Sequence, residues 1–270
     1  MRISLSRIVA GMLAAIPAAG MFAAMPAAAQ SPFDGRWRPD TSTLQSDAKP
    51  TIILLTNGVF NRDSDSAEGS VETDGKFHSI PSEGYIDEIA ITVIDDHIVE
   101  EIDKVHGKIV YTVKYVVSPD GNFLTWQVVN SANPKGTPVR SETRQRRVGT
   151  PPARSHPISG TWQTIGITVD DGSADWILKL DGNRFSSWSP QGVGYEAIVG
   201  GPAVPIQGDE AGGLAKVTMP SPDTVVKTSS SNGVVGSIFE MTILPDGKTI
   251  RATSRAPQRK AVTTFYLHKQ

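Results

Sequence analysis

The chain has 270 residues, no cysteine and a formal net charge of −2, from 26 basic and 28 acidic residues. The absence of cysteine excludes disulfides, thiol catalysis and thiolate metal sites. The near-neutral charge argues against nucleic-acid binding, because such proteins usually present a strongly basic face. Stability must therefore come from burial, and the length suits one large or two modest domains.

The first 29 residues have the pattern of a secretory signal peptide. Arg2 and Arg7 precede an apolar stretch over 8–22. Ala27-Ala28-Ala29 fits the small-x-small rule for cleavage before Gln30. Glycine and proline interrupt the apolar stretch, which is also shorter than the roughly 20 residues that span a bilayer. We expect cleavage after Ala29, a mature chain without a transmembrane segment, and a periplasmic or secreted location.

The remaining chain contains an internal duplication. Phe33-Asp34-Gly35-Arg36-Trp37 returns 125 residues later as Ile158-Ser159-Gly160-Thr161-Trp162. With a one-residue insertion, the same register continues as far as Pro119-Asp120-Gly121 and Pro245-Asp246-Gly247. Two long copies indicate a duplicated domain rather than a solenoid, whose repeats span about 20 to 50 residues.

The two copies define the expected domain organisation. The first domain should cover residues 30–148 and the second 158–270, each folded around the tryptophan of its own opening motif. Residues 149–157 form a Pro-rich linker, which is stiffer than a Gly/Ser tether. We expect a monomer with two pseudo-equivalent domains.

In the first copy, short strands alternate with tight turns. After a strand over 33–38, Asn57-Gly58 predicts a hairpin between 52–55 and 59–62. Further strands are expected over 76–80, 86–94, 97–104, 109–117, 123–129 and 139–146. The clearest alternation predicts five inward side chains: Ile109, Tyr111, Val113, Tyr115 and Val117.

The second copy repeats this plan, and neither copy shows a convincing helix. Phe239, Met241 and Ile243 replace the last three of those five inward residues. Strands are expected over 176–180, 184–188, 216–219, 225–228, 237–243, 249–254 and 262–268.

Eight or nine short antiparallel strands per copy favour an up-and-down barrel, which leaves no exposed sheet edge. A two-sheet sandwich is the alternative. The Gly-x-Trp of each first strand resembles the opening motif of lipocalin-like (calycin) barrels. Together with Asp-Gly-Lys at 74–76 and Val-Ser-Pro-Asp-Gly at 117–121, the pattern looks like that of bacterial exported lipocalin-like domains of largely unassigned function. The resemblance implies an all-β chain of two tandem lipocalin-like barrels in which Gly35 and Gly160 allow close chain passage and Trp37 and Trp162 plug the closed ends.

The resemblance also implies that an arginine of the last strand lies over the tryptophan. Arg144 is the residue expected to lie over Trp37 as a cation–π contact. The last strand of the second copy, 262–268, contains no arginine.

The densest group of titratable residues lies around His97, Glu101 and Asp103. These three share one strand face, which would suit acid–base chemistry or a metal. The second copy has no matching set, so a solvated strand face is the favoured interpretation. A calcium loop at Asp63-Ser64-Asp65 lacks the required glycine, and no catalytic or metal-binding residue is assigned.

The other polar residues do not form a recognisable catalytic or cofactor-binding motif. A basic patch formed by the arginines at 140, 144, 146 and 147 is interpreted as the outer face of a last strand, with an anionic partner as the alternative. His78, His156 and His268 are isolated, and nucleophile-elbow, zinc-protease, Walker and dinucleotide motifs are all missing. We therefore expect no cofactor.

Aromatic and flexible side chains on the strands are the best candidates for ligand contact. They are Tyr111, Tyr115 and Trp126 in the first copy, and Trp176, Phe239 and Met241 in the second. Such a lining suits a small apolar or amphipathic ligand. The alternative is that these side chains simply fill the barrels.

Three functions remain open. The favoured one is an exported, non-catalytic protein that binds or carries a small hydrophobic or amphipathic molecule. An envelope interaction module is the first alternative, and a cofactor-independent isomerase or hydrolase is the second.

Overall fold

The computed structural model describes residues 31–62, 70–80, 86–209, 212–258 and 260–270. Over these residues the chain is all-β, with 20 strands and no helix. Within this described part, therefore, no helix has the length and hydropathy needed to cross a bilayer. The predicted signal peptide and the calcium-loop residues at 63–65 lie outside the described residues.

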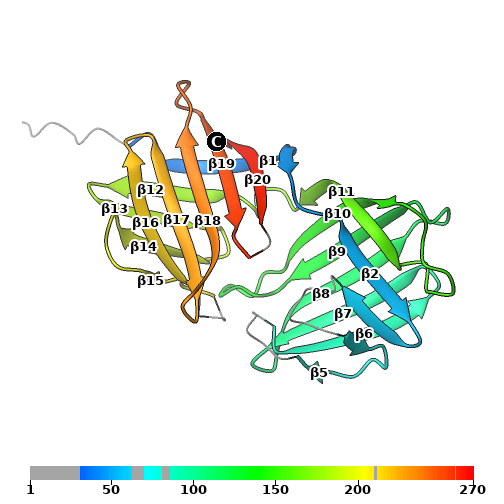
Figure 1. The fold of residues 1–270 in the computed structure, drawn as a ribbon. Coiled ribbons are helices and arrows are strands. Elements are labelled where there is room, and N and C mark those ends of the chain that lie inside the picture. Colours follow the sequence, from blue (N-terminus) through cyan, green and yellow to red (C-terminus); the bar gives the residue numbers. More distant parts are fainter. Residues whose placement is uncertain (1–30, 63–69, 81–85, 210–211, 259) are drawn as a thin grey trace, which may run out of the picture. The chain divides into compact units, whose positions relative to one another are not determined.

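The strands form two nearly closed antiparallel sheets of ten strands each, so the prediction of two β-barrels is confirmed (Figure 1). Each barrel is one continuous sheet, which excludes the two-sheet sandwich. We name the barrels by the tryptophan that each contains.

The Trp162 barrel has the strand order β4-β3-β2-β11-β10-β9-β8-β7-β6-β5. Its strands are β2 (Thr51–Thr56), β3 (Val59–Arg62), β4 (Ser70–Glu72), β5 (His78–Ser79), β6 (Glu88–Asp95), β7 (Ile98–Val105), β8 (Lys108–Val117), β9 (Phe123–Asn130), β10 (Val139–Val148) and β11 (Gly160–Val169). Near its edge, an isolated bridge joins Asp74 to Thr92.

The Trp37 barrel has the strand order β14-β13-β12-β1-β20-β19-β18-β17-β16-β15. Its strands are β1 (Gly35–Ser46), β12 (Trp176–Asp181), β13 (Arg184–Trp188), β14 (Gly194–Ile198), β15 (Val204–Pro205), β16 (Leu214–Ser221), β17 (Thr224–Ser231), β18 (Val234–Ile243), β19 (Thr249–Ala256) and β20 (Ala261–Lys269). Gly194 and Gln207 exchange two backbone hydrogen bonds of 2.8 and 3.1 Å near its edge.

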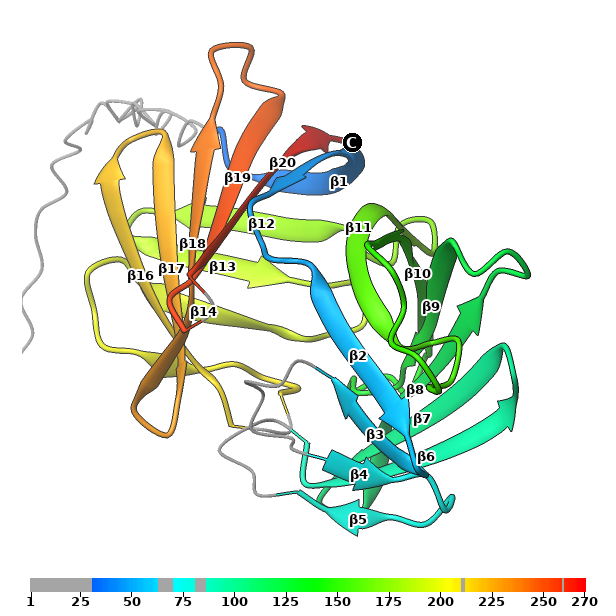
Figure 2. The ribbon, with the colours of Figure 1, turned by 45° about the vertical axis from the view of Figure 1, so that its right-hand side comes forward.

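The first strands of the two halves are exchanged. β1 pairs with β12 and β20, whereas β11 pairs with β2 and β10. In Figures 1 and 2, the consecutive strands β1 and β2 accordingly belong to different barrels. The expectation that each half folds around its own tryptophan is therefore wrong, and sheet membership departs from the expected ranges 30–148 and 158–270 by one strand each.

The Pro-rich segment 149–157 also differs from its predicted role. It joins β10 to β11 inside the Trp162 barrel and does not connect the barrels. The connections that pass from one barrel to the other are residues 47–50, which we call the first crossover, and residues 170–175, the second crossover.

The length of the first crossover gives a physical reason for the exchange. If β1 occupied the place of β11, Trp37 would pair with Thr51, as Trp162 does. Between Trp37 and Ser46 the paired residue on β20 changes from Lys269 to Thr263, a rise of about 20 Å along the strand. The chain from Ser46 to Thr51 reaches at most about 18 Å when fully extended. A full-length β1 thus cannot fold back onto its own half.

Each tryptophan plugs one end of its barrel in the same way. Trp37 and Trp162 are fully buried, and their indole nitrogens donate to the carbonyls of Phe33 and Ile158, each at 2.8 Å. Trp37 belongs to a buried core that also includes Leu178, Phe185, Val217, Ile243, Ile250 and Leu267. Trp162 belongs to a second buried core that also includes Ile53, Leu55, Phe60, Ile91, Val117 and Leu124.

A cation covers each tryptophan, but Arg144 does not provide it. The Arg147 guanidinium lies 4.0 Å from the centroid of the Trp162 ring, and the Lys269 ammonium lies 5.3 Å from that of Trp37. Arg144 instead lies over Phe123, at 4.7 Å. The prediction was wrong because sequence alone gives a strand without its register.

The glycine of each opening motif leaves room for this cation. A Cβ atom on Gly160 would lie 2.3 Å from Arg147 Nη1, and one on Gly35 would lie 2.9 Å from Lys269 Cε. Both glycines also have positive φ, +152° and +138°, a conformation that other residues rarely adopt.

We expect Gly160→Ala to lower the free energy of unfolding of the Trp162 barrel by about 2 kcal/mol or more, from backbone strain and displacement of Arg147. Urea denaturation checks the value. Gly166→Ala, on the same strand β11 with no atom near its added Cβ, is the matched control and should change the free energy by less than about 0.5 kcal/mol. Equal effects would contradict this explanation.

Candidate functional site at one end of the Trp37 barrel

The structure brings the expected ligand-contact residues together in two groups. In the Trp162 barrel, Tyr115 and Trp126 meet edge to face with ring centroids 5.3 Å apart. In the Trp37 barrel, Trp176 and Phe239 meet at 5.0 Å. Met241 is buried in the core behind the second pair. Tyr111 lies half-buried on β8.

One expected feature of β8 is wrong. Val113, Tyr115 and Val117 are buried as predicted, but Ile109 is 51% exposed. The pairing with β7 shifts between Tyr111 and Ile109, and such a bulge reverses the alternation of faces. Val110 is the buried residue there.

The Trp37 barrel carries an apolar pocket of about 290 Å³ at one end. Its lining comes from β1, the end of β11, the second crossover, β12, β20 and Ser189: Pro39, Thr41, Leu44, Val169, Ser173, Ala174, Asp175, Trp176, Ser189 and Phe265. Trp176 was predicted as a ligand contact and lines the pocket. Phe239 and Met241 are absent from this lining and support it from the core.

Phe265 completes an aromatic wall with Trp176. Its ring centroid lies 6.1 Å from that of Trp176 and 6.1 Å from that of Phe239. The alternation of 262–268 marks this strand, so Phe265 could have been found from sequence. Pro39 and Leu44 could not, because they reach the pocket through the strand exchange.

A buried carboxylate is neutralised at the pocket wall. The Asp175 side chain is 1% exposed and accepts from Arg36 Nε at 2.5 Å and from Arg38 Nε at 2.9 Å. Burial alone would raise the pKa of Asp175, but the hydrogen bonds and charges of Arg38 and Arg36 outweigh it and hold that pKa below its ordinary value. The wall is therefore largely apolar without an uncompensated charge. The network also ties β1 to the second crossover.

Asp175→Asn should destabilise the Trp37 barrel at pH 7 by about 1–3 kcal/mol, because it removes charged hydrogen bonds. A depressed folded-state pKa gives stability that is present above the unfolded value of about 3.9 and is lost as pH falls through the folded value. The difference from wild type should thus shrink below pH 4 in urea unfolding. Asp171→Asn, at a side chain that is 88% exposed, is the control. A pH-independent difference would contradict this assignment.

The interior of the Trp162 barrel holds a charged network that was predicted as a solvated face. Glu101 and Asp103 are 1% and 2% exposed, because residues 99, 101, 103 and 105 of β7 all point inward. Arg62 Nη1 donates to both oxygens of Glu101 at 3.2 Å, and the Tyr115 hydroxyl donates to Glu101 Oε2 at 2.5 Å. Burial raises the pKa of Tyr115 well above its usual range, so it remains a proton donor in this bond.

His97 does not join this network. It lies exposed in the turn before β7, where its backbone N–H donates to Asp95 Oδ1 at 2.8 Å. The strand face that sequence assigns to all three residues therefore provides Glu101 and Asp103 but no histidine.

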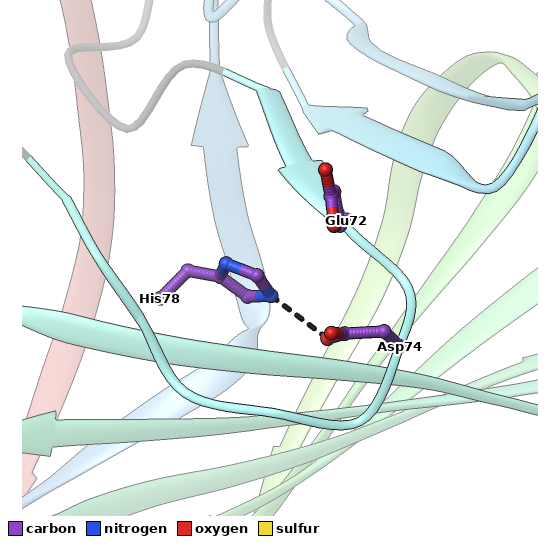
Figure 3. Close-up of side chains that lie close together, drawn as sticks. All are labelled: Glu72, Asp74 and His78. Carbon is purple, nitrogen blue, oxygen red and sulfur yellow. Dashed lines mark hydrogen bonds and ion pairs between the residues drawn. The ribbon is translucent and has the colours of Figure 1, made fainter.

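A second polar group lies on the surface beside β4 and β5 (Figure 3). One ligand atom each from Glu72, Asp74 and His78 lies within 4.8 Å of the others. His78 Nε2 lies 2.8 Å from Asp74 Oδ1, and Lys76 Nζ lies 3.2 Å from Asp74 Oδ2. Because both Asp74 oxygens already have partners, a cation would have to displace Lys76 or His78, and we assign no metal site here.

The arginines of β10 and His156, which were also singled out from the sequence, make contacts of their own. Arg140, Arg144 and Arg146 are exposed on β10, as an outer strand face requires. Arg147 instead donates to the carbonyls of Gly121, Pro157 and Ser159, each at 2.6 Å. The ring of His156 contacts the carbonyl of Asp95 at 2.9 Å.

Neither a family model nor a curated protein sequence matches this chain. The fold and the pocket thus define it as an all-β protein of two barrels, one of which has an aromatic-walled pocket at its end.

Proposed function

We propose that the protein binds or carries a small apolar or amphipathic molecule in the Trp176 pocket. The observation that carries this proposal is the aromatic wall of Trp176 and Phe265 in a pocket of about 290 Å³, close to the roughly 300 Å³ at which small-molecule sites begin. Aliphatic side chains form much of the remaining wall, and hydroxyls such as Thr41 and Ser189 supply polar contacts. Asp175 leaves no unpaired negative charge at the wall, because Arg36 and Arg38 both donate to it.

We propose a periplasmic or secreted location because residues 1–29 have the pattern of a signal peptide. A periplasmic or secreted carrier would meet lipid fragments, isoprenoids and other sparingly soluble compounds. The Gly-x-Trp openings support a kinship with lipocalin-like proteins, which we propose on sequence grounds.

Titration with geraniol and with dodecanoate, followed by tryptophan fluorescence, tests this function. We expect a saturable change for at least one of them, because the Trp176 indole would exchange water for ligand. Ala174→Phe should abolish the change by filling the pocket, while Ala174→Ser should preserve it. A signal unaffected by Ala174→Phe, or no saturable signal with either compound, would overturn the proposal.

A further inference from the structure

The interiors of the two barrels differ in chemistry at matching positions. Leu124 pairs with Gln145 in the Trp162 barrel as Ile250 pairs with Leu267 in the Trp37 barrel. Two pairs further along, and so on the same face of the sheet, Trp126 opposes Thr143 where Ala252 opposes Phe265. The same sheet register therefore carries Gln145 in one barrel and a fully buried leucine in the other.

The barrel fold does not need a polar side chain at the position of Gln145. The Trp37 barrel closes around Leu267 without a polar group at this position. A buried polar side chain in place of leucine does not help a barrel to fold unless it is fully hydrogen-bonded. Packing of the barrel therefore does not explain why a glutamine occupies position 145.

The buried glutamine and a neighbouring indole each keep one polar atom without a partner. Among the described residues, neither Gln145 Oε1 nor Trp126 Nε1 has a hydrogen-bond partner, although both atoms are buried. Gln145 is 1% exposed, and its amide nitrogen donates to Thr164 Oγ1 at 3.3 Å. If the side-chain amide of Gln145 were flipped, its nitrogen would be the atom without a hydrogen-bond partner instead. Each buried polar atom left without a hydrogen bond lowers the stability of the fold by about 1–3 kcal/mol.

These two side chains point into the same interior from neighbouring strands. Their register makes them diagonal neighbours across β9 and β10, with Cα atoms about 7–8 Å apart. Arg62 lies 5.6 Å from the centroid of the Trp126 ring, and the Tyr115 ring meets it edge to face at 5.3 Å. The indole N–H is thus held in a fixed direction.

We propose that the interior of the Trp162 barrel is a second binding site, for a small uncharged molecule with a carboxamide or hydroxyl group. The ligand oxygen accepts from Trp126 Nε1, and its N–H or O–H donates to Gln145 Oε1. The ligand is not an anion, because Glu101 already neutralises Arg62 and the interior already holds the buried carboxylates of Glu101 and Asp103, so that a further buried negative charge would have no partner. The Arg62 side chain is 17% exposed, which places this layer within reach of solvent.

Indole N–H resonances report on this site directly. The chain has five tryptophans, and Trp126→Phe identifies the Trp126 signal by its loss. Titration of the full ¹⁵N-labelled chain with acetamide should move that signal saturably. Acetone, which accepts but does not donate, should bind at least about ten-fold more weakly, and acetate, which is charged, should not bind.

The matched variants are Gln145→Leu and Leu267→Gln. Gln145→Leu, which copies the other barrel, should fold and weaken acetamide binding at least about ten-fold, whereas Leu267→Gln should leave the Trp126 titration unchanged. Saturation transfer from the protein to the acetamide methyl group provides a second measurement and should be lost in Trp126→Phe. If acetamide produces no saturable shift, or if Gln145→Leu binds as wild type does, the two atoms hold only water and the proposal is wrong.

Discussion

Trp37→Ala is expected to destabilise the strands that follow residue 176, not those that follow Trp37 along the chain. Trp37 is fully buried among side chains of β12–β20, and truncation of a buried aromatic residue costs about 3–5 kcal/mol. Hydrogen exchange read by mass spectrometry should show loss of protection in β16–β20. Peptides from β6–β10 should keep most of theirs.

Trp162→Ala is the reciprocal control for this experiment. Trp162 belongs to a buried core built from side chains of β2–β4 and β6–β9, so protection should be lost in β6–β10 and retained in β16–β20. Loss of protection after Trp37→Ala that is confined to β2–β10 would show that each half keeps its own first strand. Such a result would show that the first strands are not exchanged.

Cutting the chain between β10 and β11 should not separate its two parts. Residues 150–154 are exposed, so a specific protease sequence can replace them. After cleavage, the fragment before the cut still supplies β1 to the Trp37 barrel, and the fragment after it supplies β11 to the Trp162 barrel. Separation would require removal of an internal strand from both sheets, so size-exclusion chromatography should show one species of intact mass.

A cleaved sample in concentrated urea is the control for that measurement and should give two fragments. Two half-sized species without denaturant would contradict the exchange, because independent barrels joined by a linker separate once the linker is cut. Removal of the urea should restore the single species if the fragments complement each other.

Local sequence patterns predicted many of the strands and several of their turns. Asn57 and Gly58 have φ values of +50° and +74°, as a tight hairpin turn requires, and β2 pairs with β3 across them. Alternation along β8 identified Tyr115 and Val117 as core residues. These features depend on neighbours in sequence, and so one sequence is sufficient to find them.

The exchange could not be predicted from the same patterns. Trp37 and Trp162 carry the same local motif and fit equivalent positions, so residue type does not show which barrel receives which strand. The deciding quantity is the reach of residues 47–50, which becomes meaningful only when the register of β1 on β20 is known. Arg147 was missed as the cation over Trp162 for the same reason.

The candidate sites were predicted in part. Trp176 was found because an aromatic residue on a strand suits a ligand wall. Glu101 and Asp103 were assigned to solvent because acidic residues are rarely buried without a partner. The pairing of Glu101 with Arg62, which lies 39 residues earlier, is a tertiary contact that no local pattern reveals.

Cross-linking through introduced cysteines tests the strand exchange most directly, because the chain has no cysteine of its own. Arg38 pairs with His268, whereas β1 in the place of β11 would set Arg38 opposite Arg146, as Gln163 is now. Paired residues in antiparallel strands have Cα atoms about 4.5–5.5 Å apart, within disulfide range. Under mild oxidation we predict an intramolecular bridge in Arg38→Cys/His268→Cys and none in Arg38→Cys/Arg146→Cys. A bridge in the second variant and not in the first would contradict the exchange.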